Sequence, residues 1–216
     1  MTGWAFVSDF DGTITTFDVG DAVCLHFGAA TKEEIRRSWQ GGVSVPRWMR
    51  KMFGRLSVER QEIEAFVLSK VEPRPGFAEL AAFCKNRKLP CEIASGGVDL
   101  YISPLLKNWG LGHIETRCAK AAFDGKGWRL DYSELKGRKL EILKASRVLA
   151  HKRRGRKVVF CGDAPNDFLA AKAADIAFAR GPLLQLCRER GVSARTLTDF
   201  RKPLKLLSDG AACSLI

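Results

Sequence analysis

The amino-acid sequence predicts an α/β fold, a doubly wound, mostly parallel sheet with a Rossmann-like core and a small helical cap inserted after the first strand. Short apolar runs that end in glycine-rich or aspartate-rich loops recur along the chain, and helical patterns separate them. One long segment without a strand pattern interrupts this alternation after the first run. With 216 residues, the chain is long enough for one core that carries a smaller lobe.

Four apolar runs are predicted to be buried strands, because each is short and is halted by turn-forming residues. They cover residues 4–7, 90–94, 157–161 and 175–179. Between them lie amphipathic helical patterns, for example over residues 140–150. Strands that alternate with helices favour a parallel sheet with crossover helices. Ligands of such sheets bind beyond the carboxyl ends of the strands, so the loops at those ends are the expected place for chemistry.

The domain organisation follows from the strand-free segment. Residues 16–72 are predicted to form an all-helical cap over the active face, and residues 1–15 and 73–216 are predicted to form the catalytic core. The proline-rich exit at residues 73–76 marks the boundary. A second departure from the alternation, residues 113–132, carries the signal of a β-hairpin.

The composition is that of an ordinary globular protein, with 46% hydrophobic and 28% charged residues. No apolar run approaches the roughly 18–20 residues that would span a membrane, and the first residues lack the features of a secretory signal. The seven cysteines are scattered without a close C-x-x-C pair, which favours reduced thiols. We therefore expect a cytoplasmic protein without a membrane partner.

The net charge of +12 is compatible with either nucleic acid or a small anionic substrate. The densest basic run, residues 151–157, directly precedes a predicted strand, and a solvated helix end explains it better than a polyanion site does. No known nucleic-acid-binding motif accompanies it. We expect no nucleic-acid partner, and a basic nucleic-acid-binding protein without hydrolytic activity is the alternative from a different class.

Aspartates follow two of the predicted strands. Asp9 and Asp11 come directly after the first strand, and Asp163 and Asp167 follow the strand at residues 157–161. Asp-x-Asp-Gly can be a plain turn, and an EF-hand is excluded because no glutamate stands at the twelfth loop position. If the two strands are neighbours, these carboxylates converge. Oxygen ligands with open positions for water and phosphate suit Mg²⁺.

Two further features indicate phosphate binding. Ser95 and Gly96 lie in a Ser-Gly-Gly sequence after the second predicted strand, where a hydroxyl and free amides would form an anion-binding loop at a helix N-terminus. A lysine near the helix at residues 140–150 would stabilise the charge of a transferring phosphoryl group. Lys136, Lys139 and Lys144 are the candidates, and for Lys144 a solvated helix face is the expected position.

Together these features resemble the haloacid dehalogenase superfamily. Its signature Asp-x-Asp-Gly-Thr is matched without a gap from Asp9 to Thr13, and the serine, lysine and second acidic loop follow in the family's order over nearly the whole chain. The resemblance implies a phosphatase in which Asp9 attacks phosphorus and Asp11 acts as general acid and base.

The resemblance also implies a set of binding roles. Mg²⁺ would be held by Asp9, Asp163 and the backbone carbonyl of Asp11, with Asp167 in support. The residues implied to bind phosphate are Ser95, Gly96 and Lys139, although Lys136 is an alternative to Lys139. A phosphotransferase or phosphomutase that uses the same intermediate stays open, because the acceptor depends on the cap and not on these motifs.

The helical insertion resembles the cap of the phosphoserine phosphatase-like branch. Several short sequence segments, including Ser-Gly-Gly-Val-Asp at residues 95–99, are most similar to the methionine-salvage enol-phosphate phosphatase group. The sequence before Lys139 departs from that group, which often carries cysteines there. The implied partner is a small phosphorylated metabolite, recognised by Asp18 and Arg47, and the enzyme would be a monomer or a homodimer.

Overall fold

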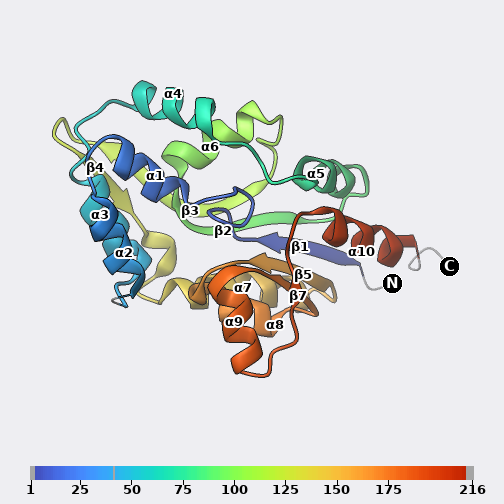
Figure 1. Cartoon of the computed structure of the whole chain (residues 1–216). Helices are drawn as coiled ribbons and strands as arrows, with labels where there is room; N and C mark the ends of the chain where they lie inside the picture. Colours follow the sequence, from blue (N-terminus) through green and yellow to red (C-terminus); the bar gives the residue numbers. More distant parts are fainter. Residues whose placement is uncertain (1–2, 41, 213–216) are drawn as a thin grey trace.

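The computed structural model describes residues 3–40 and 42–212 (Figure 1); residues 1–2, 41 and 213–216 lie outside the described residues, and with them Cys213. Seven strands in the described part of the chain form one sheet in the order β4-β3-β2-β1-β5-β6-β7. All neighbours are parallel except β3 and β4, which form an antiparallel hairpin. The strands are β1 (Trp4–Ser8), β2 (Cys91–Val98), β3 (Glu115–Phe123), β4 (Trp128–Asp131), β5 (Lys157–Gly162), β6 (Ile176–Ala179) and β7 (Arg195–Thr196).

Helices cover both faces of this sheet (Figure 1). On one face α5 packs on β2, α10 on β1 and α6 on β3, and on the other face α7 and α8 pack on β5 and β6. The helices of the described residues are α1 (Val19–His26), α2 (Lys32–Gln40), α3 (Val45–Phe53), α4 (Arg60–Lys70), α5 (Phe77–Asn86), α6 (Asp99–Asn108), α7 (Leu140–Lys152), α8 (Phe168–Ala173), α9 (Gly181–Glu189) and α10 (Arg201–Ala212), with short 3₁₀ turns η1 (Ser133–Leu135) and η2 (Pro165–Asp167).

Strand β1 separates two apolar cores, because successive side chains of a strand point to opposite faces. Phe6 belongs to the larger core, where its ring meets that of Phe200, the residue directly before α10, edge-on with 6.1 Å between the ring centroids. Ala5 and Val7 belong to the core under α7, α8 and α9. Both faces of β1 are therefore buried, as is usual for the centre of a parallel sheet.

The segment between β1 and α5 contains helices α1 to α4 (Figure 1). Its entry and exit lie side by side, because the Arg74 backbone N–H donates to the Ile14 carbonyl at 2.7 Å and Thr15 forms a β-bridge with Pro73. The Arg74 guanidinium, which is buried, donates further bonds to the carbonyls of Gly12, Thr13 and Thr15. The helical content of this segment agrees with the sequence analysis, and its division from the core as a separate cap stays a prediction.

The predicted α/β fold class is confirmed, with the first and third predicted strands adjacent and parallel. One local expectation is wrong: the Ser95-Gly96-Gly97 sequence is not a loop but the last part of β2. The pairing of β2 with β3 is nevertheless interrupted there, because Ala94 pairs with Arg117 and Val98 pairs with Ala119. Such a bulge takes backbone groups out of the regular ladder next to a site.

No helix of the described residues has the length and the apolar character that a membrane span requires. The cysteines within residues 3–40 and 42–212 are all free thiols.

Replacing Phe200 with alanine is expected to lower the free energy of unfolding by about 3–5 kcal/mol, because the fully buried ring packs on Phe6 and Phe77 and its loss leaves a cavity. Urea denaturation followed by circular dichroism measures this change. The matched control is Phe123→Ala on the hairpin, where the ring is partly exposed. Equal losses in the two variants would contradict the assignment of Phe200 to the core.

Candidate active site

The two aspartate loops meet at the carboxyl end of the sheet. Strands β1 and β5 run in parallel with Ser8 opposite Cys161, and the Asp9 N–H donates to the Cys161 carbonyl at 2.9 Å. One oxygen each from Asp9, Asp163 and Asp167 lies within 4.8 Å of the other two. The convergence expected from the sequence therefore occurs, and it follows from the adjacency of the two strands.

The turn after Asp9 can be formed only with glycine at position 12. Gly12 has a φ of +68°, and a Cβ there would lie 2.4 Å from a carboxylate oxygen of Asp163. The next residue is also engaged, because the Thr13 hydroxyl donates to Oδ1 of Asp163 at 2.9 Å. The Asp-Gly-Thr part of the motif thus brings the first acidic loop into contact with the second.

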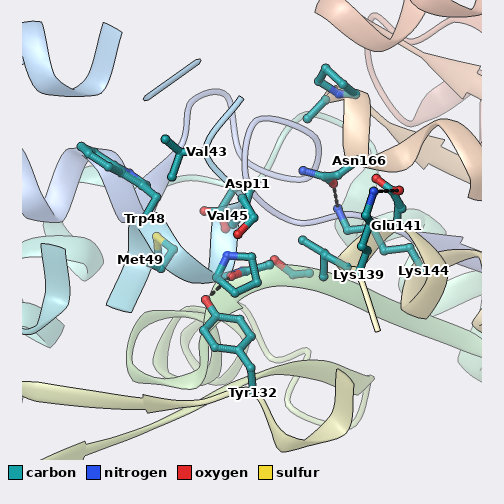
Figure 2. Close-up of a pocket in the computed structure, with 18 of the residues that line it drawn as sticks. Asp11, Val43, Val45, Trp48, Met49, Tyr132, Lys139, Glu141, Lys144 and Asn166 are labelled. Atoms are coloured by element: carbon teal, nitrogen blue, oxygen red, sulfur yellow. Dashed lines mark hydrogen bonds and ion pairs between the residues drawn. The ribbon is translucent and has the colours of Figure 1, made fainter. Parts of the chain in front are cut away.

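A lysine lies buried among these carboxylates. Lys144 of α7 is only 1% exposed, and its Nζ lies 2.9 Å from Oδ1 of Asp9 and 2.7 Å from Oδ1 of Asp167. It also donates to Oδ1 of Asn166 at 2.7 Å (Figure 2). An ammonium group has three donors, and all three find an oxygen here. The expectation that Lys144 lies on a solvated face is wrong.

The carboxylates still outnumber this single cation, and their pKa values show it. Burial raises the pKa of Asp163 to about 7, with the neighbouring Asp167 as the next cause. The pKa of Asp9 is also raised, by burial first and by Asp167 second, although Lys144 opposes the shift. For Lys144, burial lowers the pKa, but Asp167 and Asp9 raise it by more. The cluster therefore favours binding of a further positive charge.

Asp167 does not line the cavity, and its carboxylate accepts hydrogen bonds from neighbouring groups. Its Oδ1 accepts from Lys144, and its Oδ2 accepts from the backbone N–H groups of Asp163 and Ala164 at 3.2 and 3.1 Å. Its side chain is completely buried. Asp167 thus orients both Lys144 and the loop that carries Asp163.

Asp11 points away from the carboxylate cluster. Its Oδ1 accepts from the N–H of Val19 at the start of α1 at 3.0 Å, and its Oδ2 accepts from the Tyr101 hydroxyl at 2.7 Å. Burial raises the pKa of Asp11 to about 6, and the Tyr101 hydrogen bond partly opposes this. A carboxyl group with such a pKa can exchange protons near neutral pH, as a general acid and base must.

The end of β2 faces the same space. The Ser95 hydroxyl accepts from the Gly97 N–H at 2.9 Å, and the Tyr132 hydroxyl donates to the Gly96 carbonyl at 2.7 Å. A Cβ at Gly96 would lie 2.8 Å from a side-chain carbon of Val45, and one at position 97 would lie 2.5 Å from a carboxylate oxygen of Asp11. The two glycines are thus required by the close approach of β2 to its neighbours.

One cavity of about 780 Å³ (Figure 2) lies between the sheet end and helices α2 and α3. It is lined by Asp9, Asp11, Ser95, Gly96, Lys144 and Asp163. Asp18, whose carboxylate caps α1 by accepting from the Asp21 N–H at 2.8 Å, also lines it. Burial raises the pKa of Asp18, and the charges of Asp11 and Asp21 raise it further. A volume of this size is typical of small-molecule sites.

The structure places three of the candidate residues from the sequence analysis away from Asp9. The side chain of Lys139 is 80% exposed at the cavity rim, where it pairs with Glu141 at 3.9 Å, so Lys144 and not Lys139 reaches Asp9. Lys136 is exposed as well. Arg47 is exposed and does not line the cavity, whereas Arg50, three residues later on α3, does.

Sequence reasoning also missed residues whose signal was weak or absent. Lys144 lies four residues after Leu140 and four before Val148, so it shares the buried face of α7 with them. That spacing could have identified it. Tyr101 and Tyr132 carried no such signal, because only the folded chain brings their hydroxyl groups to Asp11 and Gly96.

Comparisons with known proteins agree with this geometry. Residues 6–172 match the family model of haloacid dehalogenase-like hydrolases. The chain is 33% identical to a 2-hydroxy-3-keto-5-methylthiopentenyl-1-phosphate phosphatase of Geobacillus kaustophilus, over 89% of this chain and 90% of that protein. It is also 32% identical, over 95% of its length, to the bifunctional enzyme MtnB/MtnX of Bacillus licheniformis, of which it spans about half (49%).

Solved structures share the fold. A phosphoserine phosphatase described as a phospho-aspartyl intermediate analogue superposes with a TM-score of 0.72 at 20% identity, over 96% of this chain and 100% of that one. A haloacid dehalogenase family hydrolase from Salmonella enterica serovar Typhi superposes with a TM-score of 0.75 at 16% identity. The match covers 97% of this chain and 73% of that one. The chain belongs to the haloacid dehalogenase-like hydrolases, and within them it is a phosphatase that hydrolyses phosphoric monoesters.

Replacing Lys144 with methionine is expected to lower the free energy of unfolding by about 3 kcal/mol at pH 8, because it leaves buried carboxylates without their cation. The loss should be smaller at pH 5. Without Lys144 the already raised pKa of Asp9 rises further, and an acid with a raised folded-state pKa destabilises the fold increasingly as pH rises. Urea denaturation at the two pH values measures this. Lys139→Met, at the exposed rim, is the control, and a similar loss there would contradict the assignment.

Proposed function

We propose that this enzyme is a Mg²⁺-dependent phosphatase that cleaves a small phosphate monoester through an aspartyl-phosphate on Asp9. The observation that carries the proposal is the position of Asp9. Its carboxylate lies at the end of the central strand, Lys144 holds its Oδ1, and it faces the same cavity as Asp11 and Ser95. A nucleophile, an acid and base, and phosphate-binding groups thus share one space.

The donor set fits a magnesium ion. Burial first, and the charge of Asp167 second, raise the pKa values of Asp9 and Asp163, so a further cation among these carboxylates would be stabilising. Oxygen ligands suit a hard divalent cation. Asp9, Asp163 and the backbone carbonyl of Asp11 would hold it, while Asp167 supports the loop by accepting from Lys144 and from the Asp163 N–H. Bound there, the ion would offset the negative charge of the phosphate.

The proposed reaction has two steps. In the first, a carboxylate oxygen of Asp9 attacks phosphorus, the bond from phosphorus to the ester oxygen breaks, and Asp11 gives its proton to the departing alkoxide. In the second, Asp11 takes a proton from a water molecule, which attacks phosphorus and releases Asp9 and inorganic phosphate. The hydroxyl of Ser95, the amide of Gly96 and the ammonium of Lys144 would bind the phosphoryl oxygens, so that Lys144 takes the role expected of Lys139.

For the substrate, we propose the ester named in the relatives, 2-hydroxy-3-keto-5-methylthiopentenyl-1-phosphate, as the first compound to test. Relatives with that name match about nine-tenths of the chain at 27–33% identity. We place the enzyme in the cytoplasm, in accord with the free thiols of the described residues. It would act as a monomer or a homodimer.

Asp9→Asn should lower kcat for phosphate-ester hydrolysis by roughly 10⁴-fold or more, because it removes the nucleophile while keeping the shape of the side chain. Release of inorganic phosphate with Mg²⁺ present measures the rate. Asp11→Asn is the companion variant and should slow both steps; with a labelled aryl phosphate, whose leaving group needs no proton, labelled phosphate should remain attached to the protein, since water is no longer deprotonated. Full activity of Asp9→Asn would refute the mechanism.

The metal-free protein should lose stability as the pH rises from about 4 to 8. Asp163 has a folded-state pKa of about 7 instead of 3.8, so its protonated form favours folding below the unfolded pKa, and this contribution disappears as the pH passes the folded value. Mg²⁺ at about 100 times its Kd should restore about 2.7 kcal/mol at pH 8. Thermal unfolding with EDTA or Mg²⁺ measures both effects. The stability of Asp163→Asn should change less with pH and should rise less on addition of Mg²⁺. Changes as large as those of the unaltered protein would contradict the proposed ligand set.

A further inference from the structure

One wall of the cavity comes from the helical segment and is made of apolar side chains. Figure 2 shows Val43 of the loop before α3 and Val45, Trp48 and Met49 of α3 along this wall. Trp39 of α2 also lines it. It lies opposite the end of β2, since a Cβ at Gly96 would touch Val45. A phosphate ester whose phosphorus sits at Asp9 would therefore direct its leaving group toward this wall.

The two indole rings of the wall are held by one carboxylate. Nε1–H of Trp39 donates to Oδ2 of Asp21 at 2.9 Å, and Nε1–H of Trp48 donates to Oδ1 of the same residue at 2.9 Å. Asp21 belongs to α1, so this pair of hydrogen bonds joins three helices. With the polar N–H groups engaged, the hydrocarbon parts of both rings remain to contact a ligand.

Parts of this wall are in contact with water. Trp39 is 51% exposed and Val43 is 44% exposed, although both line the cavity. Large apolar side chains gathered around a cavity in this way are typical of ligand-binding sites, because a bound apolar group removes their surface from water. The carboxylate of Asp21 is already used by the two indoles, so the wall offers no free carboxylate of its own to a charged tail.

We propose that this wall selects phosphate monoesters whose leaving group carries an apolar tail, with Trp48 and Trp39 as the specificity-determining residues and Asp21 as the positioning residue for both indoles. This rests on the function proposed above and deepens it. Asp18, beside the wall, remains available to bind a hydroxyl group nearer the ester oxygen. Arg50, which also lines the cavity, is directed to the Tyr132 ring and the Leu130 carbonyl, so a charged tail that lies against the two indole rings meets no charged partner there.

The test is a series of n-alkyl phosphates, with kcat/KM measured for ethyl, n-butyl and n-hexyl phosphate in the presence of Mg²⁺. The leaving alcohols are chemically alike, so differences report contacts with the tail. Burial of each added methylene should raise kcat/KM about fourfold, and butyl phosphate should be a better substrate than O-phosphoserine. If kcat/KM did not rise with the length of the alkyl tail, or if O-phosphoserine were the better substrate, the inference would be overturned while the phosphatase function stands. Failure to hydrolyse any ester, including the one named above, would overturn both.

Variants of the wall locate the effect. Trp48→Ala and Asp21→Ala should each lower the hexyl-to-ethyl ratio of kcat/KM at least several-fold, with the change mainly in KM, and Trp48→Phe should restore part of it. Leu68→Ala, a partly exposed apolar position on α4 outside the cavity, is the control and should keep the ratio. If Asp21→Ala or Trp48→Ala fails to fold, the exposed Val43→Ser gives the same comparison. An unchanged ratio in the folded wall variants would overturn the assignment.

Discussion

The buried ammonium of Lys144 is the interaction on which the site depends. Asp9 and Asp167 lie close together at the end of two neighbouring strands, and like charges in a buried place are costly. Lys144 offsets part of this repulsion through contacts of 2.9 and 2.7 Å. The remaining excess of negative charge, seen in the raised pKa of Asp163, is what suits the site to a further cation.

The position of Lys144 is itself secured by a second set of charges. Glu92, almost completely buried in β2, accepts hydrogen bonds from Arg147 and contacts His151 of α7 at 3.1 Å. Helix α7 carries Lys144, and β2 carries Ser95, so these contacts hold the helix with the lysine against the strand with the serine that is proposed to bind phosphate. Buried ion pairs add little net stability, but they can determine how two elements align.

The two sides of the cavity differ in chemistry. The sheet side presents carboxylates, a buried lysine and the irregular end of β2, which are the groups proposed to act on a phosphoryl group. The helical side presents indole and aliphatic surface, anchored through Asp21. In this arrangement the sheet side supplies the chemistry, and the proposed selection of the leaving group depends on side chains that could change without disturbing the catalytic loops.

The sequence by itself determined the α/β class, the order of the strands' acidic loops and the residues of the Asp-x-Asp-Gly-Thr motif, because short apolar runs and turn residues act locally. It did not determine which lysine reaches Asp9: Lys139 and Lys144 are both near the start of α7, and only packing on the sheet buries one and exposes the other. Nor could it show that Arg50 and not Arg47 lines the cavity, or that Tyr101 meets Asp11. These are contacts between distant segments, and the packing of the tertiary structure decides them.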